Sequence, residues 1–332
     1  MRYFGSKAST VERIYDLVAE RVPSGTFCDP FGGIGIVGSY FKKKGYSVWC
    51  GDILTFAHYF QIARVERDRP LSFKRLRQAL NLNSPTEVVD ILKRELPKNS
   101  RFVKEYSEKR RFFKKENAGR IEACRLRIAQ WSQSQWLTHS EHAVLLASLI
   151  NSMDKVANTA GTYYAYLKSW YRKALRPFRF ELLPYTHGNT ACHSLLCEAK
   201  YTVSLRPFDV LYLDPPYNER CYAKYYHLPE TIALGEIPKT HGKSGMPDTV
   251  KTTSNFNKPG KARRELEELL ENTRFRLLAF HYSDNGLITP IEVRQILASY
   301  GKAEEYILDS NGYTTARSPR TVQHRLYLVH HG

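Results

Sequence analysis

The sequence has little of what a membrane-spanning or secreted protein contains. Its longest apolar stretch, residues 143–150, is far shorter than the roughly 20 residues that span a bilayer. The N-terminal Met-Arg-Tyr-Phe-Gly-Ser-Lys has no apolar segment behind its basic residues, which argues against secretion and predicts a cytoplasmic protein with no membrane partner. The six cysteines form no Cys-x-x-Cys pair, so they are expected to be reduced core residues, with neither a zinc site nor a disulfide framework.

Acidic side chains are also scarce. The 332 residues include 33 Asp and Glu against 50 Lys and Arg, which leaves a net charge of +17. The hydrophobic fraction of 42% excludes general disorder and is enough to bury a sizeable core. The positive excess favours nucleic acid as a partner, because each cation that contacts a phosphate releases condensed counterions. A membrane surface is the weaker alternative, since no helix combines a basic face with a bulky apolar face.

The first 55 residues predict the opening of a doubly wound α/β sheet. A strand over 26–28 leads into the glycine-rich turn 29–35, a helix over 36–44 follows, and a second strand over 46–50 stops before Asp52. Glycines lack the Cβ that would keep a ligand away from the backbone, and the turn is neither a G-x-G-x-x-G motif nor a P-loop. An acid after the second strand is well placed to bind ribose hydroxyls. Together they favour S-adenosylmethionine over NAD or ATP.

Similar elements return after residue 185. The run 208–213 predicts a strand that ends on the motif Asp214-Pro-Pro-Tyr217, and Ser9 with Glu12 predicts a capping box for an N-terminal helix. Further elements are expected as a helix over 263–271, a strand over 276–281, a helix capped by Thr289 with Pro290 and Glu292 in its first turn, and two final strands over 305–308 and 324–329. The two final strands are expected to form an antiparallel edge of the sheet.

The chain between Gly35 and Asp214 is longer than two further strand–helix units require, by roughly 110 residues. We therefore expect a catalytic domain made of residues 1–55 and 185–332, and a mainly helical, basic insert over 56–184. Residues 101–127 hold ten Lys or Arg against four Glu, interleaved with aromatic side chains, and residues 163–173 also mix aromatics with cations. Both patterns suit phosphates and stacked bases, although a solvated helix face or aromatic packing in the core gives the same composition.

The motif Asp214-Pro215-Pro216-Tyr217 is the most specific feature of the sequence. The two prolines make the turn rigid and extended and remove two backbone donors, so that carbonyls point outward. A carboxylate, a carbonyl and an aromatic ring thus stand at the carboxyl end of a sheet. A flat base with an amino group can stack on Tyr217 and donate one hydrogen to Asp214 and the other to the Pro215 carbonyl.

On these motifs the sequence resembles the Dam-like, alpha-group N6-adenine DNA methyltransferases. The match covers most of the chain and includes residues 2–7 and 280–284, whereas the insert matches less well. The resemblance implies a Rossmann-like S-adenosylmethionine-dependent methyltransferase fold. It also implies a set of residues that contact the cofactor: Tyr3, Lys7, Asp29, Phe31, Gly33, Gly35, Asp52 and Ile53. Lys7 is expected near the methionine carboxylate, and Asn189 stands in for an acid that the family usually places before the Asp-Pro-Pro-Tyr strand.

The resemblance predicts a site-specific enzyme that transfers a methyl group from S-adenosylmethionine to a flipped-out adenine in double-stranded DNA. Asp214, Pro215, Pro216 and Tyr217 are the expected catalytic residues. The expected DNA-binding residues are Lys109, Arg110, Arg111, Lys168, Arg172, Lys173, Tyr225 and His227, although His227 also fits a structural histidine. The alternatives are an amino methyltransferase acting on cytosine N4, RNA or protein, and an inactive DNA-binding relative. We expect a monomer or weak dimer without a metal, acting alone or beside a restriction endonuclease.

Residues 239–258 are rich in Gly, Ser, Thr, Asn, Lys and Pro and show little periodicity. This composition predicts a mobile loop near the active site.

Overall fold

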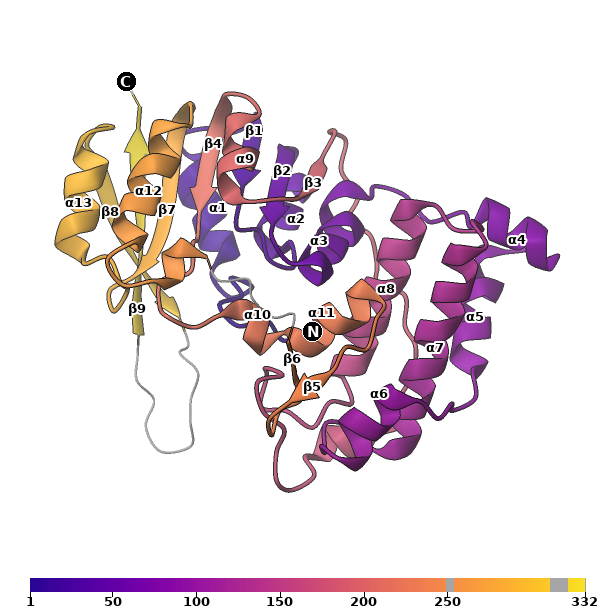
Figure 1. The fold of residues 1–332 in the computed structure, drawn as a ribbon. Helices are drawn as coiled ribbons and strands as arrows, with labels where there is room; N and C mark the ends of the chain where they lie inside the picture. The colour runs from indigo at the N-terminus through magenta and orange to yellow at the C-terminus, as the bar shows by residue number, and fades with distance from the viewer. Residues whose placement is uncertain (249–253, 311–321, 332) are drawn as a thin grey trace.

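The computed structural model describes residues 1–248, 254–310 and 322–331, and its centre is a seven-stranded sheet (Figure 1). The strands are β1 (Thr26–Asp29), β2 (Ser47–Asp52), β3 (His193–Leu196), β4 (Phe208–Leu213), β7 (Phe275–Ser283), β8 (Ala303–Ser310) and β9 (Val322–His330). Their order is β3-β2-β1-β4-β7-β9-β8, and β9 runs antiparallel to both of its neighbours while the other pairs are parallel. The predicted methyltransferase fold with an antiparallel C-terminal edge is confirmed.

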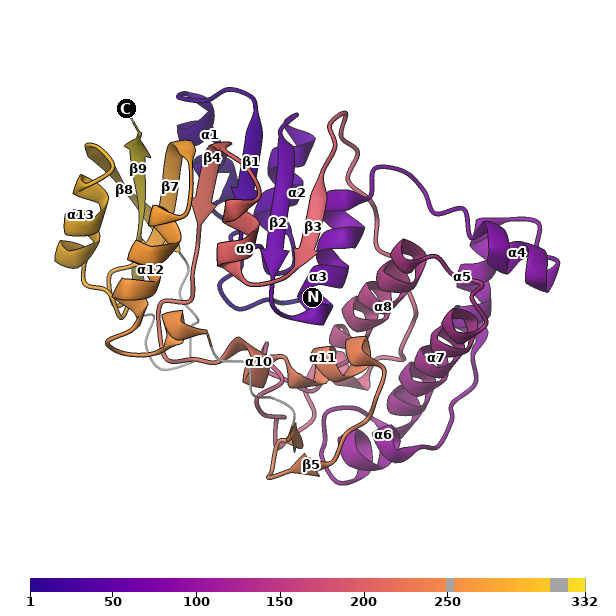
Figure 2. The ribbon, with the colours of Figure 1, turned by 45° about the horizontal axis from the view of Figure 1, so that its top comes forward.

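Helices cover both faces of this sheet (Figure 2). The helices α1 (Val11–Ala19) and α2 (Ile36–Lys43) share a core with one set of strand side chains, whereas α9 (Ala199–Ser204), α12 (Ala262–Glu271) and α13 (Pro290–Ala298) share a core with the alternate set. Phe27 and Cys28 illustrate the alternation, because they are adjacent in β1 and belong to opposite cores. The sheet is therefore buried on both sides, as parallel sheets require.

One predicted helix start is correct and another is wrong. Thr289 and Glu292 form the expected capping box of α13. At the N-terminus, α1 begins at Val11, and none of the described side chains caps it, so the predicted capping box of Ser9 and Glu12 is wrong. The backbone explains the difference, because the Thr10 and Val11 amides both donate to the Lys7 carbonyl, at 3.0 and 2.7 Å.

A helical layer lies beside the sheet and continues the chain from β2. Its elements are α3 (Thr55–Gln61), the π-helix η1 (Ile62–Glu66), α4 (Lys74–Leu80), α5 (Pro85–Arg94), α6 (Arg101–Val103), the π-helix η2 (Lys104–Glu108), α7 (Lys115–Gln133), α8 (His139–Asp154) and the 3₁₀-helix η3 (Arg172–Leu175). Two later helices, α10 (Tyr222–Tyr225) and α11 (His227–Leu234), contribute to the same core. The layer thus combines the region of the expected insert with the chain that follows the Asp-Pro-Pro-Tyr motif. None of the helices in the described ranges is long and apolar enough to cross a membrane.

The segment expected to be a mobile loop contains a hairpin of β5 (Thr240–His241) and β6 (Met246–Pro247), and then the 3₁₀-helix η4 (Asn255–Asn257). The hairpin is attached to η2 and to the residues just after it: Thr240 donates to Glu105 over 2.9 Å, and Arg110 donates to the Gly242 carbonyl over 3.0 Å. Residues 240–247 thus form a short hairpin where an irregular loop was predicted, and contacts with a segment 135 residues earlier in the chain hold the hairpin in place. Residues 249–253 lie outside the described part.

Candidate active site

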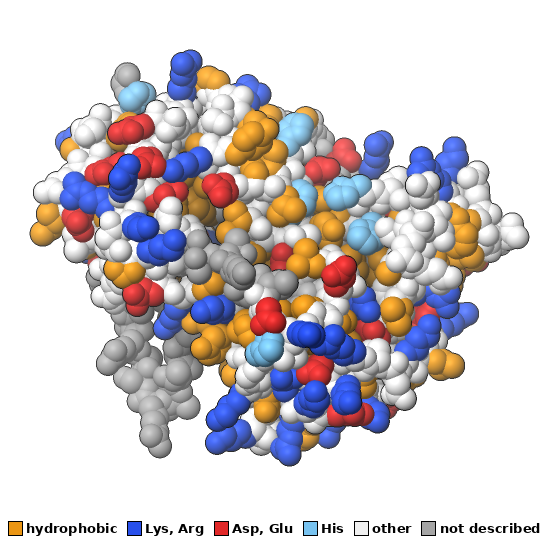
Figure 3. Space-filling view, viewed as in Figure 1, with side chains coloured by type: hydrophobic (Ala, Val, Ile, Leu, Met, Phe, Trp, Pro, Cys, Tyr) orange, Lys and Arg blue, Asp and Glu red, His pale blue; other side chains and the backbone are white. Residues whose placement is uncertain are grey.

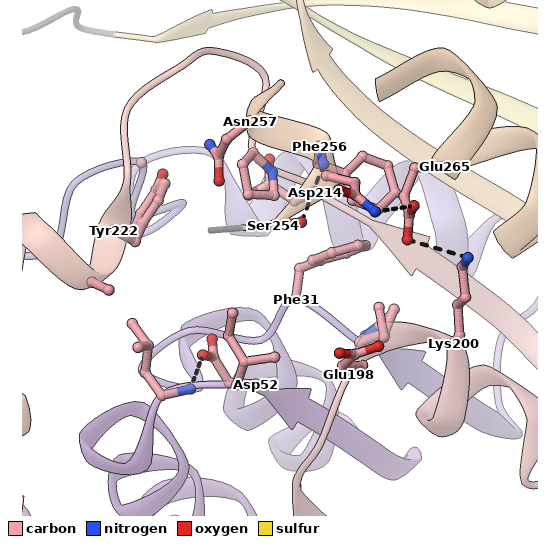
Figure 4. Close-up of a pocket in the computed structure, with 18 of the residues that line it drawn as sticks. Phe31, Asp52, Glu198, Lys200, Asp214, Tyr222, Ser254, Phe256, Asn257 and Glu265 are labelled. Atoms are coloured by element: carbon pink, nitrogen blue, oxygen red, sulfur yellow. Dashed lines mark hydrogen bonds and ion pairs between the residues drawn. The ribbon is translucent and has the colours of Figure 1, made fainter. Parts of the chain in front are cut away.

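Four carboxylates gather where the parallel strands end. Asp29 and Asp52 are the last residues of β1 and β2, and Glu198 and Asp214 follow β3 and β4. Because the carboxyl ends of parallel strands meet at one edge of a sheet, these side chains face the same region. A cavity of about 240 Å³ lies there (Figure 4), and its lining includes Phe31, Asp52, Ile53, Glu198, Asp214 and Tyr222. Residues of several sequence motifs thus line the same cavity.

The glycine turn shapes a second, smaller cavity of about 40 Å³, lined among others by Tyr3, Lys7, Asp29 and Gly33. Gly33 has a φ of 50°, and a Cβ there would stand 2.7 Å from Cε1 of Tyr3. The position therefore requires glycine. Gly35, with a φ of 75°, lies outside the linings of both cavities and precedes α2.

Residues of the helical layer hold this turn in place. Nε2 of Gln61, at the end of α3, donates to the Gly33 carbonyl over 2.9 Å and to the Gly51 carbonyl over 3.3 Å. Arg64, in the π-helix η1, donates to the Ile34 carbonyl over 2.8 Å. Neither residue is recognisable from the sequence, because each acts on backbone about 30 residues away.

Asp52 organises the turn that follows β2. Its carboxylate accepts the Gly33 amide over 3.1 Å and the Leu54 amide over 2.9 Å. Burial raises the pKa of Asp52 to about 7, and the nearby carboxylate of Glu230 acts in the same direction, against the hydrogen bonds from the backbone. Ile53, beside it, is 38% exposed at the cavity. The pair presents one polar and one apolar group to the same space.

Asp214 is held as a charged carboxylate. It forms an ion pair with Lys7, whose ammonium group also donates to the Gly5 carbonyl over 2.9 Å. Nδ1 of His281, in β7, lies 3.4 Å from Oδ1 of Asp214. Burial alone would raise the pKa of Asp214, but Lys7 and His281 outweigh that effect and hold the pKa at about 2. Lys7 thus contacts the predicted catalytic carboxylate, a contact that the sequence did not indicate.

The other residues of the motif occupy different positions. Pro216 lines the larger cavity, and Pro215 is buried. The ring of Tyr217 packs edge-on against Tyr282 and His324, with centroid distances of 6.1 and 5.4 Å, and is not part of either cavity lining.

Aromatic side chains from the N-terminus pack against those of α10 and of the residue before α11. Tyr3 stacks on Tyr226 with a centroid distance of 5.0 Å, and Tyr222 lines the larger cavity. Tyr225, one of the expected DNA-binding residues, is half-buried and packs edge-on against Phe4 and Tyr164.

The sequence assignment of Asn189 is wrong. Asn189 is exposed and precedes β3, and its neighbour Thr190 donates to the Tyr46 carbonyl just before β2 begins. Asn189 therefore lies at the amino ends of these strands, at the opposite edge of the sheet from Asp52. The acid at the correct edge is Glu198, which lines the larger cavity. Glu198 follows the short strand β3 by two residues, much as Asp214 follows β4, so only recognition of that strand would have indicated it.

Two predicted DNA-binding residues are buried. His227 is fully buried, Nε2 lies 2.9 Å from the Tyr163 carbonyl, and burial lowers its pKa to about 4. Arg110 is 9% exposed and pairs with Glu105 over 2.5 Å. Both assignments are corrected by these contacts: His227 is a core histidine, and Arg110 ties η2 to the hairpin.

The remaining predicted cations differ in exposure. Lys109, Arg111, Lys168 and Arg172 are exposed, whereas Lys173 is half-buried and donates to the Asp154 carbonyl over 2.9 Å. The aromatics interleaved with residues 101–127 are fully buried in the helical core, namely Phe102, Tyr106, Phe112 and Phe113. They are not available to stack on bases.

The short helix η4 completes the wall of the larger cavity, in the segment that the sequence places near the active site. Phe256 packs edge-on against Phe31 with a centroid distance of 5.1 Å. Nδ2 of Asn257 donates to the carbonyls of Asn218 and Arg220, over 2.7 and 3.0 Å. The chain just after the Asp-Pro-Pro-Tyr motif is thereby fastened to the cavity wall.

Comparison with known proteins assigns the chain to a family. The model of the D12 class N6 adenine-specific DNA methyltransferases matches residues 3–295. The chain belongs to this family. It is 32% identical over 324 residues to the type II methyltransferase M.FokI of Planomicrobium okeanokoites, which covers 96% of this chain and 50% of that protein.

Two other relatives have different lengths. The modification methylase StsI of Streptococcus sanguinis is 29% identical, with 90% of this chain and 46% of that protein covered. The type II methyltransferase M.NlaIII of Neisseria lactamica is 27% identical, with 97% and 94% covered. This member of the D12 class therefore spans about half the length of M.FokI and StsI and nearly all of M.NlaIII.

Proposed function

We propose that this protein transfers a methyl group from S-adenosylmethionine to the N6 amino group of an adenine in DNA, as the modification enzyme of a restriction-modification system. One observation carries the proposal: Asp214, whose pKa is held at about 2, lines with Pro216 a cavity that is also lined by Phe31 of the glycine turn and by Asp52. Membership of the D12 class and the names of the relatives support the same activity.

The two cavities fit the parts of S-adenosylmethionine. Oδ1 of Asp29 is buried and has no hydrogen-bond partner among the described residues, so it suits a ligand ammonium group in the smaller cavity. Gly33 leaves room for the methionyl chain, and Lys7 borders this cavity and suits a carboxylate. In the larger cavity Asp52 suits the ribose hydroxyls, Ile53 and Phe31 suit the adenine faces, and Glu198 suits the adenine amino group.

The cofactor would supply a methyl group on a positively charged sulfur. Asp214 and the Pro215 carbonyl would accept the two hydrogens of the target amino group, which turns the nitrogen lone pair away from the ring and toward the methyl group. In this arrangement the amino nitrogen would be held for formation of the N–C bond as the C–S bond of the cofactor breaks, and the released proton would pass to water. A pKa of about 2 makes Asp214 a hydrogen-bond acceptor and a poor base, so removal of the proton before transfer is not its role.

The proposed DNA surface lies on the helical layer and the hairpin. Figure 3 shows Lys and Arg side chains gathered over the lower lobe of the molecule, where α6 and β5 lie. The exposed cations proposed to contact DNA are Lys109, Arg111, Lys168 and Arg172 in the helical layer, and Lys239 and Lys243 at the hairpin. Arg111 also donates to the Lys168 carbonyl over 3.0 Å, which keeps two of these positions together. Flipping the adenine out of the duplex costs a few kcal/mol, which such backbone contacts would offset.

The test is methyl transfer with identification of the product. Double-stranded DNA is incubated with the purified chain and labelled S-adenosylmethionine, and the DNA is digested to nucleosides. The expected labelled product is N6-methyldeoxyadenosine. Label in N4-methyldeoxycytidine, label only when RNA replaces DNA, or the absence of label would each overturn the proposal. Single-molecule sequencing of DNA from expressing cells would then show which adenines are modified.

A further inference from the structure

Glu230, in α11, reaches across to the first turn of α3. Its Oε1 accepts the Thr55 amide and its Oε2 accepts the Phe56 amide, both over 2.9 Å. The first amides of a helix have no partner within the helix, and the residue preceding α3, Leu54, has no side chain that can cap it. A carboxylate from another element, 175 residues later in the chain, therefore serves as the helix cap.

This cap is continuous with the contacts of Asp52. Asp52 accepts the Leu54 amide, and Glu230 accepts the next two amides, so three consecutive amides are divided between two carboxylates. The turn between them carries Ile53 at the larger cavity. Asp52 also accepts the Gly33 amide and so links the glycine turn to the start of α3. A shift of the start of α3 would therefore change the positions of Asp52 and Ile53 relative to the glycine turn.

The helix that carries Glu230 is itself firmly held. At its start, Tyr226 accepts the Phe4 amide through its hydroxyl over 2.6 Å, and the buried His227 contacts the Tyr163 carbonyl. The following turn packs Leu228 and Ile232 into the helical core. Glu230 thus fixes the turn after β2 relative to the helical layer.

We propose that Glu230 is a positioning residue for cofactor binding, which holds the Asp52–Ile53–Leu54 turn in the geometry that receives the nucleoside. This inference rests on the proposed function, because it assigns the nucleoside of S-adenosylmethionine to that turn. Glu230 itself lines neither cavity, so it acts through Asp52 and α3.

The charge of Glu230 gives the proposal a pH signature. The groups that interact electrostatically with Asp52 are Glu230 from α11, Asp29 from the neighbouring strand β1, Cys50 from the same strand β2, and the hydroxyls of Tyr3 and Tyr222. The pKa of Asp52 is about 7, and ribose hydroxyls are bound better by the carboxylate than by the acid. Cofactor affinity is therefore expected to rise with pH through about 7. Removal of the Glu230 charge lowers the pKa of Asp52 and moves this rise to lower pH.

The experiment is calorimetric titration of the whole chain with S-adenosylmethionine from pH 5.5 to 9, without DNA. Glu230→Gln keeps one acceptor and the size of the side chain, Glu230→Ala removes both acceptors, and Glu236→Gln is the control at an exposed glutamate just after α11. We expect Glu230→Gln to weaken binding roughly tenfold above pH 8, the scale of one hydrogen bond to a charged group, and to lower the pH midpoint of binding. Glu230→Ala should weaken binding further, and Glu236→Gln should match the wild type.

A purely structural Glu230 gives a different pattern. Both variants would then melt at lower temperature, yet bind the cofactor with wild-type affinity and an unshifted midpoint while folded, and the proposal would be overturned. If the folded wild-type chain binds no S-adenosylmethionine at any pH, the proposed function fails first and the role of Glu230 fails with it.

Discussion

Replacing Arg110 by alanine is expected to lower the stability of the fold, whereas replacing its two basic neighbours is expected to weaken DNA binding. Arg110 lies between Lys109 and Arg111 in sequence, but its side chain is 11% exposed and is paired with Glu105, whereas the side chain of Lys109 is 53% exposed. Arg111 is exposed as well. Composition treats the three residues as one basic run, while the structure divides them into one internal anchor and two surface cations.

The magnitudes follow from this division. Lys109→Ala with Arg111→Ala removes at most two phosphate contacts, so the slope of log affinity against log salt should shrink by about 1.8, at roughly 0.9 per contact. Arg110→Ala leaves Glu105 with Lys109 and Thr240 but without its buried partner. Breaking a buried ion pair costs about 3 kcal/mol or more of unfolding free energy, and the surviving partners place the expected loss near that lower bound.

Two assays separate these outcomes. DNA binding is measured by fluorescence anisotropy from 50 to 300 mM salt, and unfolding by urea titration. Arg264→Ala, at an exposed residue of α12 on the sheet side, is the control and should change neither quantity appreciably. The reasoning is refuted if Arg110→Ala lowers the salt slope by about one while leaving stability intact, or if the double variant leaves the slope unchanged.

Two further predictions concern the cofactor turn and the helical core. Gly33→Ala should weaken S-adenosylmethionine binding at least tenfold in calorimetry and leave DNA affinity unchanged, because the new Cβ would stand 2.7 Å from Tyr3 at a φ of 50°; wild-type cofactor affinity would show that the turn does not receive the ligand. His227 has a pKa of about 4 in the fold against about 6.5 unfolded, so the unfolded chain takes up the proton first and stability falls as pH drops from 6.5 toward 4. His227→Gln should therefore remove about 2 kcal/mol of the wild-type loss in urea-derived stability between pH 7 and pH 5; an unchanged loss would mean that His227 titrates normally.

The parts of the fold that the sequence predicts are those that depend on local patterns. The strand before Asp214 is a run of apolar and aromatic residues, the turn 29–35 is marked by its glycines, and the capping box of α13 lies within four residues. Asp52 and Asp214 were predictable for a related reason, since a residue directly after a parallel strand lies at the edge where ligands bind.

The contacts that the sequence did not predict join residues far apart in the chain. Lys7 meets Asp214 across 207 positions, and Glu230 caps a helix 175 positions earlier. Glu198 was missed because β3 has only four residues, two of them exposed, so the sequence contains no run of apolar residues that would predict this strand. His227 and Arg110 were misassigned because composition records charge and aromaticity but not which side of a helix faces the core.

The central claim is that the Asp214 carboxylate acts on the target amino group and not on cofactor binding. Its most direct test is the single-turnover rate of methyl transfer to cognate DNA by Asp214→Ala, measured beside the calorimetric affinity of the same variant for S-adenosylmethionine. We expect a rate at least about 100-fold below wild type, the usual cost of removing one group that stabilises the transition state, with cofactor affinity within a few fold. A variant that transfers methyl groups at a near-normal rate would contradict it.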